Sequence, residues 1–177
     1  MKTVRWMIAA VAVALLSLTG CTLPTPNSAA QVGTTAISVA ELDRTTTAVA
    51  GVLGAVADEL RPSVLTALIQ NELARQIAVQ AGVTVDPAGR AALFAGSEGL
   101  AALAKTPGTA EFANGVADVQ AVLNAVGGND AFIQAAARVP VNVNPRFGTW
   151  DAASLAPAGL GSISQPYAAA STEPANR

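Results

Sequence analysis

Two segments with the pattern of short β-strands lie at opposite ends of the central part of this chain, about a hundred residues apart. Residues 31–38 predict a hairpin of two strands around a tight turn at Gly33-Thr34, and residues 139–144 alternate apolar and polar side chains. Pro140 has no N–H to donate, so the second segment is expected at a sheet edge, or to pair only after this residue. A hairpin alone is marginal in water and needs a third strand or a packed helix. We therefore expect both segments to pair in one small sheet, with the intervening chain enclosed between them.

The alternation also predicts which side chains share a face of this sheet. Successive residues of a strand point to opposite faces, so Val141 and Val143 are expected on one face and Asn142 and Asn144 on the other. The valine face would then lie on the core.

Start and stop signals divide the chain between the two segments into helices. Ser38-Val39-Ala40-Glu41 has the pattern of a capping box, in which Ser38 accepts from a backbone N–H and Glu41 reaches back. Pro62 suits the first turn of a second helix. Asp86-Pro87 has an N-cap residue followed by proline at the first helical position, which predicts the start of a third helix.

Apolar stripes on these helices are expected to form the core, because an amphipathic helix buries one face by default. Gly51 and Gly54 would weaken the first helix, or would allow a neighbouring helix to pack closely. The fold class is therefore expected to be mostly α (α+β), a bundle of about five helices with a small sheet formed by the N-terminal hairpin and a C-terminal strand. A further short helix is expected over residues 130–138. The stripes are Leu42, Val49, Val52, Leu53, Val56 and Leu60; Leu65, Leu68, Ile69, Leu73 and Ile77, ending at Gly82; Leu93 and Phe94; Leu100 and Leu103, ending before Pro107; Phe112, Val116, Val119, Leu123 and Val126, ending at Gly127-Gly128; and Phe132 and Ile133.

The first twenty residues have the pattern of an export signal. Lys2 and Arg5 precede an apolar stretch, and Leu18-Thr19-Gly20-Cys21 follows it. This run resembles the lipobox of bacterial lipoproteins (Leu18, Thr19, Gly20 and the cysteine). That resemblance implies cleavage after Gly20, lipid attachment at Cys21, and anchoring on the extracytoplasmic side of the cell membrane. The alternatives are an unmodified signal peptide or a spanning anchor, but a span needs about 20 apolar residues and polar residues follow at once.

Composition shifts predict the domain boundaries. Residues 1–20 are assigned to the signal peptide and residues 21–29 to a linker rich in Pro, Thr and Ser. Residues 30–150 are assigned to a folded helical domain. Residues 151–177 are poor in charge and rich in Ala, Ser, Gly and Pro, which predicts a disordered tail, and ending the chain at Leu155 should cost almost no stability.

Composition also excludes most enzyme classes. The chain has no histidine, so it has no Ser-His-Asp triad, Cys-His pair or histidine metal site. Asp58 and Glu59 are adjacent, so on a helix they point in different directions, and no other acidic pair has a suitable spacing. Removing Lys2 and Arg5 with the signal leaves 8 basic against 12 acidic residues, a net charge of −4. We therefore expect no catalytic residues, no cofactor, no metal, no small-molecule substrate and no nucleic-acid partner.

Three segments together resemble the N-terminal chaperone domain of the SurA/PrsA-like foldases. They are Val32-Gly33-Thr34-Thr35-Ala36-Ile37-Ser38 with Ala40-Glu41-Leu42, the helix from Leu65 into Ala81-Gly82-Val83-Thr84-Val85, and Val141-Asn142-Val143-Asn144-Pro145-Arg146-Phe147-Gly148-Thr149-Trp150. The resemblance implies a hairpin joined by a strand from the far end of the domain. It also implies binding of extended, unfolded polypeptide by apolar surface between helices. Many members have glycine where Thr34 stands, and the prolyl isomerase domain that many carry has neither the room nor the histidines here.

These observations predict a lipid-anchored, non-catalytic chaperone or peptide-binding module for exported proteins. The alternative is an envelope adaptor or structural lipoprotein that uses the same surface for one fixed protein partner, and an enzyme using carboxylates alone is a third class. Phe147 and Trp150 would line a client groove or pack against the helices. Arg146 would bind a carboxylate, or bond to solvent and backbone.

Overall fold

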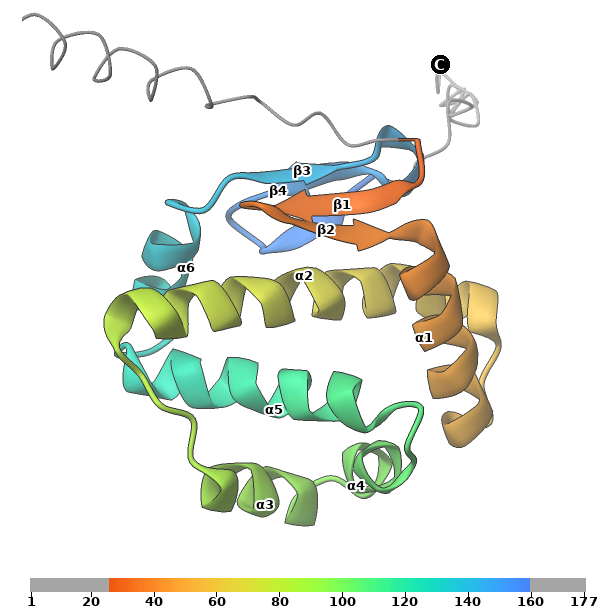
Figure 1. The fold of residues 1–177 in the computed structure, drawn as a ribbon, viewed down its shortest axis with the longest axis horizontal. Coiled ribbons are helices and arrows are strands. Elements are labelled where there is room, and N and C mark those ends of the chain that lie inside the picture. The colour runs from red at the N-terminus through yellow and green to blue at the C-terminus, as the bar shows by residue number, and fades with distance from the viewer. Residues whose placement is uncertain (1–25, 160–177) are drawn as a thin grey trace, which may run out of the picture.

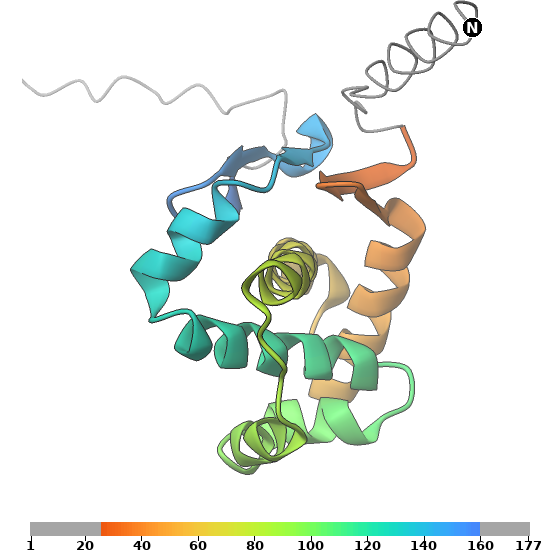
Figure 2. The ribbon, with the colours of Figure 1, turned by 60° about the vertical axis from the view of Figure 1, so that its left-hand side comes forward.

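A long helix at the centre of the domain organises the fold, as the computed structural model of residues 26–159 shows (Figure 1). Within that range the helices are α1 (Val39–Leu53), α2 (Ala57–Ala81), α3 (Pro87–Ala95), α4 (Glu98–Lys105), α5 (Ala110–Ala125) and α6 (Asn129–Ala136). The strands are β1 (Ser28–Val32), β2 (Thr35–Ser38), β3 (Val141–Val143), β4 (Thr149–Asp151) and β5 (Ala156–Ala158), with a 3-10 turn at Pro145–Phe147. Viewed nearly end-on, α2 is encircled by the sheet, α1, α5 and α6 (Figure 2). The predicted fold class, mostly α with a small sheet, is therefore confirmed.

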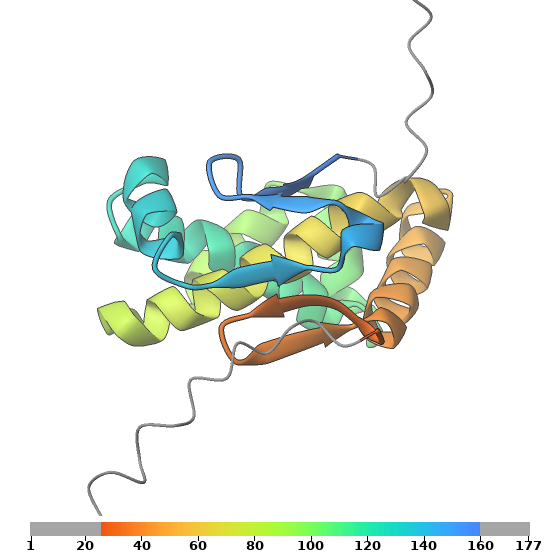
Figure 3. The same ribbon diagram turned by 90° about the horizontal axis from the view of Figure 1, so that it is seen from above.

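The two strand-like ends of the domain pair with each other, as expected. The sheet order is β2-β1-β3, both pairs being antiparallel, and Gln31 lies opposite Asn142 (Figure 3). The N–H of Gly33 donates to the Pro140 carbonyl at 2.8 Å, just before β3 begins. The proline thus lies at the start of an edge strand, where its missing N–H costs nothing.

One residue of this strand departs from the predicted alternation. Asn142 is exposed, but Asn144 is buried rather than facing solvent with it. Regular pairing ends at Val143, and the Asn144 side chain turns inward to donate from Nδ2 to the Ser28 carbonyl at 2.9 Å. Its Oδ1 accepts from the N–H of Arg146 at 3.1 Å, which starts the 3-10 turn.

Helix starts follow the capping signals. Ser38 accepts from the N–H of Glu41 at 3.0 Å, and Asp86 accepts from the N–H of Ala88 at 2.9 Å with Pro87 at the first helical position. The boundary between α1 and α2 differs from the expectation. Gly54 takes a φ of 65° and ends α1, so the apolar stripe does not continue to Leu60 in one helix.

Pro62 consequently lies inside α2, not in its first turn. The helix begins five residues earlier, at Ala57, and Asp58 and Glu59 occupy the first turn. Negative side chains there are stabilised by the helix dipole, which favours this earlier start. The proline still removes one backbone hydrogen bond near the helix start.

The core lies around α2, which contacts the sheet on one side and α5 on the other. Leu65, Ile69, Leu73 and Ile77 of α2 are all buried, together with Phe132 of α6. On α5 the buried residues are two alanines, Ala113 and Ala117, and Val122, whereas the residues of the predicted stripe are half-buried. Small side chains at this contact let α5 approach α2 closely.

The glycine that allows two helices to pack closely is Gly115 of α5, not Gly51 or Gly54, which the sequence analysis considered. A Cβ at Gly51 or Gly54 would meet nothing within 4 Å. A Cβ at Gly115 of α5 would lie 2.7 Å from Cγ of Asn71 on α2, closer than such atoms pack. Gly115 therefore sets the spacing of these two helices.

The fold extends beyond the predicted domain at both ends. β1 begins at Ser28, inside the expected linker, and β4 and β5 pair within the expected tail. Leu155 is 7% exposed, and its carbonyl accepts from Nε2 of Gln70 at 3.0 Å, which anchors this hairpin on α2. The prediction of a tail beginning at residue 151 is thus wrong through residue 159, because one buried leucine supplies the contact. No helix within residues 26–159 is both long and apolar enough to cross a membrane.

Candidate functional site

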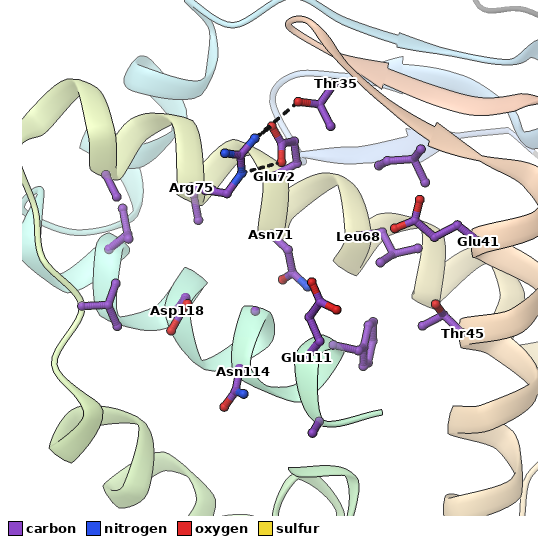
Figure 4. A pocket seen from close by; sticks show the side chains of 18 of the residues that line it. Thr35, Glu41, Thr45, Leu68, Asn71, Glu72, Arg75, Glu111, Asn114 and Asp118 are labelled. Atoms are coloured by element: carbon purple, nitrogen blue, oxygen red, sulfur yellow. Dashed lines mark hydrogen bonds and ion pairs between the residues drawn. The ribbon is translucent and has the colours of Figure 1, made fainter. Parts of the chain in front are cut away.

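A groove with a volume of about 870 Å³ opens on the side of the domain where β2, α1, α2 and α5 meet (Figure 4). α2 supplies its floor, β2 and the start of α1 form one wall, and α5 forms the opposite wall. The segment after α2 and the loop before α5 border its ends. The groove is large enough for several residues of an extended chain and has the size of ordinary ligand sites.

Apolar side chains contribute from every wall of this groove. Leu68 and Val79 come from α2, Ile37 from β2 and Phe112 from α5. Val79 is 77% exposed, one of the three large apolar residues that stand out on the described surface. Val79 therefore adds exposed apolar surface to the groove next to that of the other lining residues.

A polar network joins the β-hairpin to α2 at one edge of the groove. Arg75 donates to both carboxylate oxygens of Glu72, at 2.8 and 2.6 Å, and its Nη2 lies 3.3 Å from Oγ1 of Thr35. Gln76 donates from Nε2 to Glu72 at 2.7 Å and to the Val32 carbonyl at 3.0 Å. Gly33 suits its place beside this network because its φ is 57°, in the left-handed region that favours glycine, and a Cβ there would also displace the Gln76 amide, whose Oε1 would lie 2.6 Å away.

These contacts keep the network charged. Partial burial alone would raise the pKa of Glu72, but hydrogen bonds from Arg75, Gln76 and Thr35 outweigh it and hold that pKa below its ordinary value. The same contact with Glu72 raises the pKa of Arg75. Glu72 and Arg75 therefore form an ion pair at neutral pH, and Arg75 attaches the β-hairpin to α2 through Thr35.

A second ion pair closes the far end of the groove. Arg90 of α3 donates to both oxygens of Asp118 on α5, with Nη2 at 2.8 Å from Oδ2. The hydrogen bond from Arg90 to Asp118 raises the pKa of the arginine. The pair joins α3 to α5 and neutralises both charges.

Three further charged residues face the groove and form no ion pair with another described residue: Glu41 and Arg44 on α1, and Glu111 on α5. Glu111 points toward Asn71 on the floor, and Glu41 points toward Leu68 from the opposite side (Figure 4). The Oδ1 of Asn71 is a buried acceptor without a partner among the described residues. The two acids outnumber the single arginine, so the unpaired charge of the groove is slightly negative.

The residues that the sequence offered as candidate groove residues lie elsewhere. Phe147 and Trp150 are half-buried and pack against the core instead of lining the groove. Arg146 donates to the Pro26 carbonyl at 3.3 Å and stacks over Phe147, so it bonds to backbone as one alternative expected. Asp58 and Glu59 sit at the N-terminus of α2, outside the groove.

The lipobox, Leu18, Thr19 and Gly20 with Cys21, lies outside the described residues. Within residues 26–159, no group of three or more Cys, Asp or Glu side chains is arranged to hold a metal ion.

Sequence reasoning did not single out the residues that line the groove. Glu111 and Val79 lie on amphipathic helices, where an exposed side chain has the same pattern whether it faces open solvent or a groove. Only the packing of α5 against α2 brings them to one site.

Searches against family models, curated proteins and solved structures found no match to this chain.

Proposed function

We propose that this protein is a membrane-anchored lipoprotein whose groove holds extended segments of exported polypeptides without catalysis. The observation that carries the proposal is the groove itself, which has apolar side chains on every wall and an exposed valine at its edge. A site of this kind gains binding energy from burying apolar surface, which suits unfolded clients of varied sequence.

The two paired carboxylates of the groove have a structural role and are not free for catalysis. Glu72 and Asp118 each pair with an arginine, and a depressed pKa keeps Glu72 ionised. A general acid or base needs a pKa near the working pH and access to a substrate proton. Glu72 instead uses its oxygens to hold Arg75 and Gln76.

The predicted lipid would place the start of the folded domain close to the bilayer. Seven residue steps separate Cys21 from Ser28, where β1 begins. Fully extended, they span about 25 Å at most. The start of the folded domain would therefore lie within about 25 Å of the membrane surface, where a client would emerge.

The test is the slowing of aggregation of unrelated unfolding proteins by the chain from residue 22 onward, at near-stoichiometric ratios and without ATP. Val79→Ser should weaken this effect, because it removes exposed apolar surface from the groove. Val56→Ser is the matched control, since Val56 is 58% exposed and lies outside the groove. No effect on several clients, together with tight capture of one envelope protein, would favour the adaptor instead.

A further inference from the structure

The wall of the groove formed by β2 is an open sheet edge. In the order β2-β1-β3, no described strand lies beyond β2. In the β1–β2 hairpin Val32 lies opposite Thr35, Gln31 opposite Ala36 and Ala30 opposite Ile37. Only two residues, Gly33 and Thr34, connect the strands, so Val32 and Thr35 are the bonded pair that closes the turn. Antiparallel ladders alternate bonded and non-bonded pairs, so the N–H and C=O of Ala36, opposite Gln31, point away from β1.

Ladder bonds on the other side of β1 support this assignment. The N–H of Gly33 donates to Pro140 at 2.8 Å, and the N–H of Asn144 donates to Ala29 at 2.9 Å. Odd-numbered residues of β1 therefore bond to β3, which leaves the even-numbered ones for β2. The backbone of Ala36 is thus free to bond outward.

This open edge faces the groove. Thr35, Ala36 and Ile37 all line it, and Ala36 is exposed. Its outward N–H and C=O are the donor and acceptor that an added strand needs. An added strand lies about 4.8 Å from its neighbour, whereas a helix needs a width of about 10 Å, so the edge favours an extended chain.

The charges of the groove add a preference to this geometry. Arg75 and Arg90 are neutralised by Glu72 and Asp118, and of the three remaining charged residues two are acids on opposite walls, Glu41 and Glu111. Arg44 offsets one of them. A lysine or arginine in the bound segment would find a carboxylate on either side.

We propose that β2 accepts an extended segment of a client as a fourth strand, bonded to Ala36, and that the preferred segment has a basic residue among apolar ones. This inference rests on the function proposed above and specifies its binding mode. Backbone bonding gives affinity for many sequences, while the two carboxylates select for positive charge.

The first test uses a fluorescent nine-residue peptide of alternating valine and threonine with a central lysine, bound to the chain from residue 22 onward. N-methyl groups are placed on the peptide backbone one position at a time. Strand pairing predicts that affinity falls about fivefold or more at the one position whose N–H faces Ala36 and little at the two positions beside it, because the N–H groups of those neighbours point away from β2. The N-methyl groups are on the peptide, so they cannot change the stability of the protein.

Hydrogen exchange at the amide of Ala36 is the second readout. On binding the peptide, its exchange should slow about tenfold or more, since the N–H gains a partner. If the peptide binds and Val79→Ser weakens it, but the Ala36 amide and the N-methyl series show no effect, strand pairing is overturned and the groove function stands. If neither the peptide nor any unfolded client binds, both are overturned.

Charge preference is tested with the same peptide carrying glutamate in place of the central lysine. The lysine peptide should bind more tightly, and Glu111→Gln should reduce that preference while the control Glu98→Gln, on α4 outside the groove, should not. Equal affinities of the two peptides for the unmodified protein would overturn the basic preference.

Discussion

Gly115→Ala should destabilise the domain, although alanine is the better helix former. Gly115 is within α5, and a Cβ there would lie 2.7 Å from Cγ of Asn71 and closer still to its Nδ2. Asn71 is a short side chain, so its Cγ moves only if χ1 changes or the helices separate. Both residues line the groove, so the substitution also probes how the groove floor is built.

Two opposing effects set the size of this change. Replacing glycine by alanine inside a helix favours folding by about 1 kcal/mol. Overpacking at a close helix contact costs about 1–3 kcal/mol. The net result for Gly115→Ala should be a loss of about 0–2 kcal/mol in the free energy of unfolding.

Asn71→Ala supplies the matched background. It removes Cγ and the amide, including a buried Oδ1 that has no partner among the described residues. In this background Gly115→Ala should stabilise by up to about 1 kcal/mol, so the coupling between the two sites is about 1–3 kcal/mol. Gly51→Ala in α1, where a Cβ meets nothing within 4 Å, should stabilise in either background.

Urea unfolding of these variants, followed by circular dichroism, gives the free energies directly. If Gly115→Ala stabilises equally with and without Asn71→Ala, then α2 and α5 do not approach each other as described.

Three further predictions concern pH, chain length and anchoring. The folded-state pKa of Glu72 is depressed, so the stabilisation from ionised Glu72 is present above its unfolded-state pKa and is lost as the pH falls through its folded-state pKa. Glu72→Gln should therefore cost about 1 kcal/mol or less of unfolding free energy at pH 7 and flatten the fall in stability below about pH 5. An unchanged pH profile would contradict this. Ending the chain at Ala137 removes β3 and should prevent cooperative unfolding. Ending it at Ser154 removes buried Leu155 and β5 and should lower the free energy of unfolding by about 2 kcal/mol. Equal melting temperatures of the two truncated chains would refute the pairing of β1 with β3. Cys21→Ala should move the protein out of the membrane fraction, and retained lipid labelling would show that the lipobox interpretation is wrong.

Features of the fold that depend on local chemistry could be predicted from the sequence. The cap at Ser38 and the Asp86-Pro87 helix start are set by side chains within a few residues of the backbone groups they satisfy. The pairing of β1 with β3 is a long-range contact, yet it followed because a lone hairpin would leave its apolar face and edges unsupported.

Features that depend on how helices meet could not be predicted in this way. The apolar period continues across Gly54, so the sequence analysis interpreted this glycine as weakening one continuous helix, whereas it ends α1. On α5 the phenylalanine, leucine and valines of the predicted stripe suggested the buried face, but Ala113, Ala117 and Val122 occupy it, and Gly115 lets the helix approach Asn71. The groove forms because α5 and α2 pack together in this way, so the sequence did not predict which residues line it.

A nitrogen–proton NMR titration of the labelled chain, from residue 22 onward, with the lysine-centred peptide tests the central claim most directly. The account predicts that shifted amides gather along β2, the start of α1 and the groove face of α5, including Ala36 and Glu111. Amides near Val56 and Phe147, which lie outside the groove, should stay unchanged. Shifts gathered around those two residues, or no shifts at millimolar peptide, would contradict a client groove at this site.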